Sequence, residues 1–210
     1  MVELKIPPRE NGYARGKDIH EQILRAAYDV LIDEGVGALT MRKIAGRCNL
    51  QAGHMRYYFV SKQDLIRELL SAITQSYTDM IAGIVLDPNA TPEKRLENIV
   101  SIICDDIATK DTTRVFTSLW GQSNYDDFIN NCVNKIYEPG RILLGTLVRD
   151  LNPNFDDEDI SDITLFMQSS LEGLTIFAGF GKSNRHKIEK MKKFYLSSFL
   201  AAIKPTAVAV

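Results

Sequence analysis

Apolar residues recur at three- and four-residue spacing along the chain, and this periodicity limits the fold more than any other feature of the sequence. It is first clear after the proline and glycine breaks of the first sixteen residues, in Ile19, Ile23, Ala26, Ala27, Val30 and Leu31. Residues at this spacing lie on one face of an α-helix. No segment shows the strict alternation of a half-buried strand, so the sequence predicts an all-α protein.

Capping and breaking residues mark where the other helices begin and end. Thr40 is a good N-cap for a short helix, and Ser61 with Asp64 forms a start similar to a capping box for a long one. After the first helix, the pattern predicts helices over residues 41–48, 51–57, 61–86, 92–107, 113–120, 124–150, 160–178 and 184–202. We expect Pro139 and Gly140 to disturb the helix over 124–150, because proline lacks a backbone donor.

The charge is divided unevenly along a chain whose net charge is −2. Residues 1–62 carry ten Lys and Arg against seven Asp and Glu, whereas residues 63–210 carry fifteen against twenty. A basic segment in an acidic protein suggests a local contact with a polyanion. A chance distribution gives a difference of this size too, so charge alone does not decide the function.

The cysteines and the absence of long apolar runs exclude several classes of protein. Cys48, Cys104 and Cys132 are scattered, without the paired spacing of a zinc site or a disulfide framework. No run approaches the ~18 apolar residues of a membrane span, and the N-terminus has no signal-like segment. We therefore expect a cytoplasmic protein with no metal, no cofactor and no membrane contact.

The segment from Thr40 to Leu65 combines basic and aromatic residues and indicates nucleic-acid binding. Two short helices joined by a tight turn, with an earlier helix packed across them, form the helix-turn-helix module. The first turn of the second short helix reaches base edges in the DNA major groove. Here that turn is Gln51-Ala52-Gly53-His54, which offers an amide to adenine, a methyl contact to thymine, a close backbone approach and an imidazole.

Other residues of the same region are predicted to bind phosphate groups. Tyr57 and Tyr58 offer hydroxyl groups, while Thr40 caps a helix whose free N–H groups can meet a phosphate. Cationic side chains would add affinity that is independent of base sequence. The predicted cationic contacts are Arg15, Lys17, Arg42, Lys43, Arg56 and Lys62. His20 and His186 are expected to be ordinary surface residues.

On these residues the chain resembles the TetR family of transcriptional regulators. The resemblance covers about residues 18–70 and rests on Gly35, Thr40, Ile44-Ala45, Leu50, Gly53, Tyr58-Phe59, Lys62 and Leu65. The chain departs from the family pattern at Asn49, Gln51 and Arg56, where Gly, Ser and Tyr are usual. Because Gln51 and His54 face the groove, differences there would change which operator is bound.

The resemblance implies a ligand-responsive homodimeric repressor that binds a palindromic operator in double-stranded DNA. The resemblance agrees with a helix-turn-helix domain over 18–62 and implies a helical effector-binding and dimerisation domain over 63–210. Gly12, Tyr13, Arg15 and Lys17 predict a mobile basic arm over 1–17. The last two long helices would form the dimer contact. A small-molecule effector would bind among the middle helices.

Large side chains on the predicted middle helices are the candidates for effector binding, although simple core packing explains many of them. The candidates are Phe116, Trp120, Tyr125, Phe128, Tyr137, Phe166, Met167 and Phe177. The segment "TSLWGQSNYDDF" also resembles the choline-responsive repressors of betaine synthesis. Trp120 and Tyr125 beside a carboxylate could hold a quaternary ammonium group by cation–π attraction. A hydrophobic or aromatic effector fits the same residues.

The alternative to a regulator is an all-α enzyme or a helical interaction module that uses the acidic residues of 63–210. Carboxylate metal sites in helical bundles usually contain Glu-x-x-His pairs. The chain contains no such pair and no nucleotide-binding or hydrolase motif. The sequence therefore favours a DNA-binding regulator over an enzyme.

Overall fold

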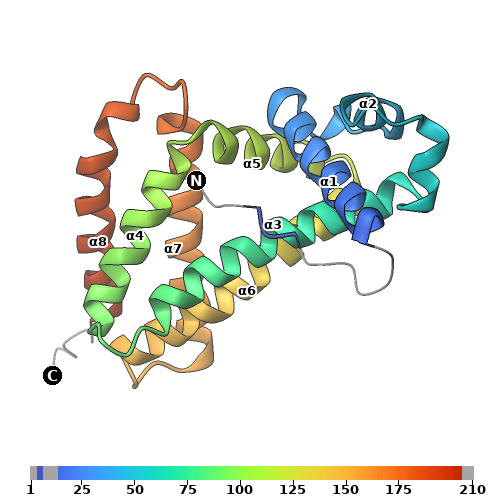
Figure 1. The fold of residues 1–210 in the computed structure, drawn as a ribbon. Helices are drawn as coiled ribbons and strands as arrows, with labels where there is room; N and C mark the ends of the chain where they lie inside the picture. Colours follow the sequence, from blue (N-terminus) through green and yellow to red (C-terminus); the bar gives the residue numbers. More distant parts are fainter. Residues whose placement is uncertain (1–3, 7–13, 205–210) are drawn as a thin grey trace, which may run out of the picture. The chain divides into compact units, whose positions relative to one another are not determined.

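The computed structural model describes residues 4–6 and 14–204, and these residues form helices and connecting turns without any strand (Figure 1). This confirms the all-α prediction. The α-helices are α1 (Ala14–Glu34), α2 (Met41–Arg47), α3 (Lys62–Val85), α4 (Pro92–Ile107), α5 (Lys110–Ser123), α6 (Asp127–Leu151), α7 (Asp157–Ala178) and α8 (Ile188–Ile203). Short 3-10 helices are η1 (Val36–Ala38), η2 (Ala52–Tyr57) and η3 (Arg185–Lys187).

The predicted caps are present, and several helix boundaries differ from the prediction. Thr40 accepts a hydrogen bond from the Lys43 N–H, and Ser61 accepts one from the Asp64 N–H at 3.1 Å. Helix α6 continues through Pro139, so the expected disturbance does not interrupt it. Helix α7 begins earlier than predicted, because Asp156 forms a capping box with Asp159.

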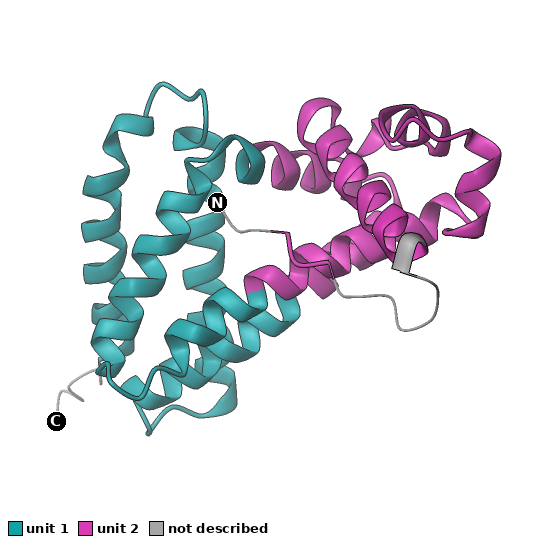
Figure 2. Cartoon of the chain, in the orientation of Figure 1, with its two compact units in different colours: residues 1, 78–113, 137–210 teal, residues 2–77, 114–136 magenta. Residues whose placement is uncertain are grey.

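The chain divides into two compact units, which are coloured separately in Figure 2. The first unit contains residues 78–113 and 137–210, and the second contains residues 2–77 and 114–136. Helices α3, α5 and α6 therefore each contribute residues to both units.

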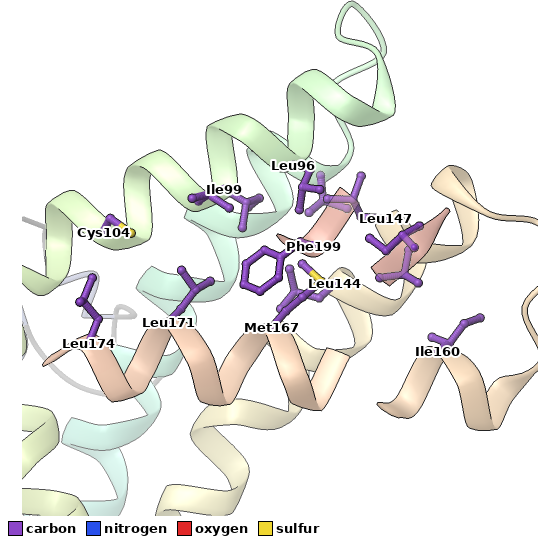
Figure 3. Packing of buried hydrophobic residues seen from close by; sticks show 14 of the residues in the cluster. Leu96, Ile99, Cys104, Leu144, Leu147, Ile160, Met167, Leu171, Leu174 and Phe199 are labelled. Carbon is purple, nitrogen blue, oxygen red and sulfur yellow. The ribbon is translucent and has the colours of Figure 1, made fainter. Parts of the chain in front are cut away.

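The core of the first unit is made by α4, α7 and α8, which pack against one another, together with part of α6. Phe199 of α8 is fully buried and lies among Ile99 of α4 and Met167 and Leu171 of α7 (Figure 3). A small residue brings α6 close to α7: a Cβ at Gly145 would lie 3.2 Å from a methyl group of Ile160.

The turn between α2 and η2 has the geometry of a Schellman motif. The Leu50 N–H donates to the Ala45 carbonyl at 2.9 Å, and the Asn49 N–H donates to the Gly46 carbonyl at 3.3 Å. Asn49 has φ of 55°, in the left-handed region that glycine and asparagine enter most easily. Asparagine can therefore take the place of the glycine that is usual at this position in the TetR pattern, because both residues adopt positive φ.

Gly35, at the end of α1, also needs the absence of a side chain. Its φ is 84°, and a Cβ there would lie 2.8 Å from the Ser118 Oγ. That hydroxyl accepts a hydrogen bond from the Val36 N–H at 2.8 Å. The contact joins the start of η1 to α5 within the second unit.

The structure describes part of the predicted N-terminal arm, namely residues 4–6 and 14–17. Leu4 is 7% exposed, and the Lys5 N–H donates to the Ser76 Oγ at 2.8 Å. Residues 14–17 belong to α1 and are helical. The rest of the predicted arm lies outside the described residues.

Replacing Asn49 tests the left-handed turn. Asn49→Ala should lower the free energy of unfolding by about 1–2 kcal/mol, because alanine is strained at positive φ, whereas Asn49→Gly should be close to wild type. Urea denaturation measures both. As a control, Asn134→Ala on the exposed face of α6 should not destabilise the protein, because alanine favours a helix. Equal stability of Asn49→Ala and Asn49→Gly would contradict the assignment.

Candidate nucleic-acid interface and effector site

The first turn of η2 is exposed while its other face is buried. Gln51, Ala52, Gly53 and His54 are all exposed, whereas Met55, the next residue, is fully buried. Phe59 is 2% exposed and donates its N–H to the Met55 carbonyl at 2.9 Å. The two apolar anchors thus fix the direction in which the turn faces. The short helix predicted over 51–57 is a 3-10 helix over Ala52–Tyr57, with Gln51 as its N-cap.

A buried histidine supports this arrangement, and its prediction as a surface residue is wrong. His20 of α1 is only 3% exposed, and its ring stacks on Phe59 with centroids 5.0 Å apart. Its Nε2 lies 2.7 Å from Glu68 Oε1 on α3. The signal that sequence reasoning missed is its spacing: His20 lies three residues before Ile23, on the apolar face of α1. His186 is exposed, as predicted.

The aromatic residues after the turn lie at different depths. Tyr57 is 79% exposed, and its ring lies 6.2 Å from the His54 ring. Tyr58 is partly buried, and Arg56 is exposed. His54 and Tyr57 therefore present a polar and aromatic surface beside residues 51–53.

The cations on α2 differ in whether an acidic residue already pairs with them. Lys43 forms an ion pair with Glu34, and the hydrogen bond from Lys43 lowers the pKa of that carboxyl group. Arg47 pairs with Asp33 and Glu34. Arg42 is exposed and forms no ion pair with any of the described residues. Of these cations, Arg42 is the one whose charge is available to an external anion.

Two further predicted contacts lie in the first turn of a helix. Lys62 begins α3 and is exposed, close in sequence to the cap at Ser61. Lys17 lies in the first turns of α1 and is partly exposed. Arg15 also belongs to α1, but its side chain lies outside the described part of the chain.

The candidate effector residues are divided between the two units. In the second unit, Phe116 is 6% exposed and contacts the rings of Tyr77 and Trp120, with centroids 5.4 and 6.1 Å away. Phe128 lies under the Arg67 guanidinium. Tyr125 is 90% exposed, and its cage with Trp120 stays a prediction.

The other candidates belong to the first unit and also differ in exposure. Met167 is fully buried in the core cluster, and Phe177 and Phe166 are 67% and 43% exposed. Tyr137 is partly buried on α6. Phe177 and Phe166 are thus available to another surface, and Tyr137 is the candidate that meets a polar interior group.

That interior group is Glu172 of α7, which sequence reasoning did not single out. Glu172 is only partly accessible, and Tyr137 forms a side-chain hydrogen bond with it. Burial, partly opposed by this hydrogen bond and reinforced by the charge of Asp106, raises the pKa of Glu172 to about 7. Asp106 of α4 is 5% exposed and accepts a hydrogen bond from the Thr112 hydroxyl at 2.7 Å. One turn beyond Glu172 on α7 lies Thr175, which is fully buried.

Two surface pockets contain few of the candidate effector residues. A groove of about 440 Å³ runs between α6 and α7, and its lining includes Arg141, Arg149 and Thr164 but none of the candidate effector residues. A smaller pocket of about 160 Å³ in the second unit includes Phe128 and Lys62.

The cysteines do not form a chemical site. All three are free thiols, and burial raises the pKa of each, that of Cys104 to about 12. Within the described chain no three His, Cys, Asp or Glu side chains are grouped in a way that would hold a metal ion. No described helix combines the length and the hydropathy of a membrane-spanning segment.

Two family models match the chain. The model described as "Bacterial regulatory proteins, tetR family" matches residues 23–69, which contain the exposed turn and its supporting helices. The model described as "BetI-type transcriptional repressor, C-terminal" matches residues 92–201, more than half of the chain.

Individual relatives agree with these models. The HTH-type transcriptional regulator BetI of Stenotrophomonas maltophilia is 27% identical over 104 residues, which is 49% of this chain and 53% of that protein. The chain thus spans about half the length of this curated relative. A TetR-family regulator from Mesorhizobium loti has a similar fold, with a TM-score of 0.74 over 90% of this chain and 98% of that one at 14% identity. A regulator from Saccharomonospora viridis in complex with choline gives a TM-score of 0.71, at 19% identity, over 88% of this chain and 96% of that one.

The raised pKa of Glu172 predicts a pH-dependent effect of its replacement. The folded protein holds this proton more tightly than the unfolded chain, so the free energy of unfolding falls as pH rises from 4.5 to about 7. Glu172→Gln removes this dependence. We expect Glu172→Gln to have a higher Tm than wild type at pH 8 and a smaller advantage at pH 5. Each kcal/mol of difference in the free energy of unfolding should shift Tm by about 2–4 °C.

Differential scanning calorimetry at both pH values measures this difference. Glu158→Gln, an exposed position on the same helix, is the matched control and should show no such change. A constant Tm difference for Glu172→Gln would show that this carboxyl group titrates normally.

Proposed function

The chain belongs to the TetR family of bacterial regulatory proteins, and from this premise we propose that it is a homodimeric repressor which a small molecule releases from its operator. The observation that carries the proposal is the exposed turn 51–54, held by the buried Met55 and Phe59. A short helix that presents its first turn in this way is the reading element of a helix-turn-helix module.

The side chains of this turn suit base recognition. Gln51 offers an amide that can bind the adenine edge in two places, and Ala52 can contact a thymine methyl group. His54 and Tyr57 lie beside each other and extend the same surface. We assign base selection to Gln51, Ala52 and His54, with Gly53 allowing a close backbone approach.

The surrounding groups suit phosphate binding. Thr40 and the N–H groups at the start of α2 form a helix N-terminus that attracts anions. Arg42, Arg56 and Lys62 are exposed cations, whereas Lys43 would first have to leave Glu34. We therefore expect Arg42 to contribute more to phosphate binding than Lys43.

The dimer contact is assigned to the exposed apolar faces of α7 and α8. Large exposed apolar side chains on these helices and the turn between them are Leu165, Phe166, Ile176, Phe177, Phe180 and Phe194. Ser169 and Gly173 lie between the large residues of α7 and allow a second helix to approach closely. A patch of this kind marks a protein interface. A two-fold dimer would place the 51–54 turns of its two subunits ~34–36 Å apart, which is the length of one helical turn of DNA.

The effector is assigned to the first unit, and its effect passes along the helices that both units share. Helices α3, α5 and α6 run from one unit into the other, so a change among their residues in the first unit alters their residues in the second. A preference of ~1–3 kcal/mol for the non-binding form would weaken DNA binding 5- to 150-fold. The Saccharomonospora viridis regulator binds choline, so small organic cations are one candidate effector class.

The alternative of an all-α enzyme is not favoured. Both family models describe regulatory proteins, and the larger one describes a transcriptional repressor.

Binding to the DNA upstream of the protein's own gene tests the proposed function. Fluorescence anisotropy should show tight binding that weakens steeply with salt. Gln51→Ala should weaken operator binding by about 1–3 kcal/mol and leave binding to unrelated DNA unchanged, because it removes a base contact. Failure of the wild-type dimer to bind the upstream DNA at low salt would refute the function.

Neighbouring cations on α2 provide the matched comparison for this measurement. Arg42→Ala should reduce the slope of log Kd against log salt by about 1, as expected for one lost phosphate contact. Lys43→Ala should change the slope less, because Glu34 already neutralises Lys43. A larger change in slope for Lys43→Ala than for Arg42→Ala would show that Lys43, not Arg42, is the main phosphate contact on α2.

Charge placed in the proposed dimer face should separate the subunits. Phe177→Glu should convert the dimer into monomers in sedimentation equilibrium, because a buried carboxylate without a partner strongly disfavours association. Ile142→Glu on α6 is the control, since Ile142 is also exposed at 66% but lies outside the proposed face. A Phe177→Glu protein that stays dimeric would place the interface elsewhere.

A further inference from the structure

We propose that Glu172, Tyr137 and Thr175 bind a cation that donates hydrogen bonds, so that the effector is a protonated primary or secondary amine rather than a quaternary ammonium ion. The proposal rests on the proposed function, since it names the chemistry of the effector. It concerns residues of the first unit alone, on α6 and α7.

Glu172 is a largely buried carboxyl group without a cationic partner. No Lys, Arg or His among the described residues forms an ion pair with it, and its polar contact is the Tyr137 hydroxyl. A buried carboxylate without a paired charge is strongly disfavoured. The group therefore either holds a proton or accepts a positive charge from outside the chain.

Thr175 gives a second and independent indication of a ligand. It is fully buried, and its Oγ1 makes no hydrogen bond with the described residues. Thr175 lies one turn after Glu172 on α7, so both side chains share one face of the helix. A buried hydroxyl oxygen without a donor loses free energy that an incoming N–H group would restore.

The charges on the neighbouring helices also favour a cation. On α4, Asp106 adds a second buried carboxylate, whose charge raises the pKa of Glu172. On α8, Lys192 already binds Asp105 at 2.6 Å and Glu189 at 2.7 Å. On α6, Tyr137 contributes a neutral hydroxyl group. The charge around Glu172 is therefore negative, because Lys192 is already paired with Asp105 and Glu189.

Hydrogen-bond geometry decides between the two kinds of cation. The charged nitrogen of a quaternary ammonium ion carries only alkyl groups, so this nitrogen would donate no hydrogen bond to the Thr175 oxygen or to Glu172. A protonated primary amine presents three N–H donors, enough for Glu172 and Thr175 together. Charge-assisted hydrogen bonds of this kind are roughly twice as strong as neutral ones.

Isothermal titration calorimetry of the full-length protein with matched amines tests the inference. Ethanolamine, N,N-dimethylethanolamine and choline differ only in their methyl groups, and spermidine and arginine extend the series to larger cations. We expect binding of at least one N–H-bearing cation, and at least tenfold tighter binding of ethanolamine than of choline. Choline binding as tight as ethanolamine binding, or no binding of any of these cations, would overturn the inference.

Three variants assign the binding to this cluster. Glu172→Gln keeps the size of the side chain and should weaken amine binding at least tenfold, while the exposed Glu158→Gln should not. Thr175→Val should weaken amine binding and raise Tm, because it removes an unsatisfied buried hydroxyl group. A purely structural role would change Tm without changing amine affinity. Unaltered amine affinity in Glu172→Gln would refute the site.

Operator binding without any amine separates this inference from the proposed function. Glu172→Gln should bind the upstream DNA as wild type does, because Glu172 lies in the first unit and the 51–54 turn lies in the second. Tight binding of the upstream DNA combined with indifference to all five cations would refute the effector chemistry and leave the repressor assignment intact. Loss of DNA binding in the wild type would refute the proposed function itself.

Discussion

The burial of Met55 and Phe59 is the constraint on which the candidate DNA-binding surface depends. Both side chains enter the core of the second unit, so the opposite face of η2, with residues 51–54, must point outward. The left-handed conformation of Asn49 directs the chain into η2, and the ring of His20 stacks on Phe59, just after the end of η2. A six-residue 3-10 helix has few hydrogen bonds of its own, so tertiary packing rather than helix propensity holds its direction.

The first unit shows the opposite arrangement, in which polar groups are buried among apolar helices. Glu172, Asp106 and Thr175 lie beside a core of leucine, isoleucine and phenylalanine side chains. Apolar residues at all of these positions would stabilise the fold more easily. Retaining acidic groups there is a departure from local stability of the kind expected at functional sites.

Much of the fold follows from sequence periodicity, because helices and their caps depend on residues close together in the chain. Thr40, Ser61 and Asp64 behave as predicted, since a cap needs only a side chain three residues from its partner. The pairing of Lys43 with Glu34 and the burial of His20 depend on how α1 packs on its neighbours, which periodicity does not show. The exposure of Tyr125, a predicted effector contact, depends on packing in the same way, and so does the burial of Glu172, which looks in the sequence like an ordinary charged residue of a helix.

The exposed phenylalanine and isoleucine side chains of α7 and α8 have a consequence for gene control. In the proposed dimer, two subunits cover these faces. When the protein is scarce, the concentration of this DNA-binding dimer is then proportional to the square of the concentration of free subunits. The folded stability of the protein also rises with its concentration, because association favours the native chain. A modest change in synthesis of the regulator would therefore be amplified into a larger change in promoter occupancy.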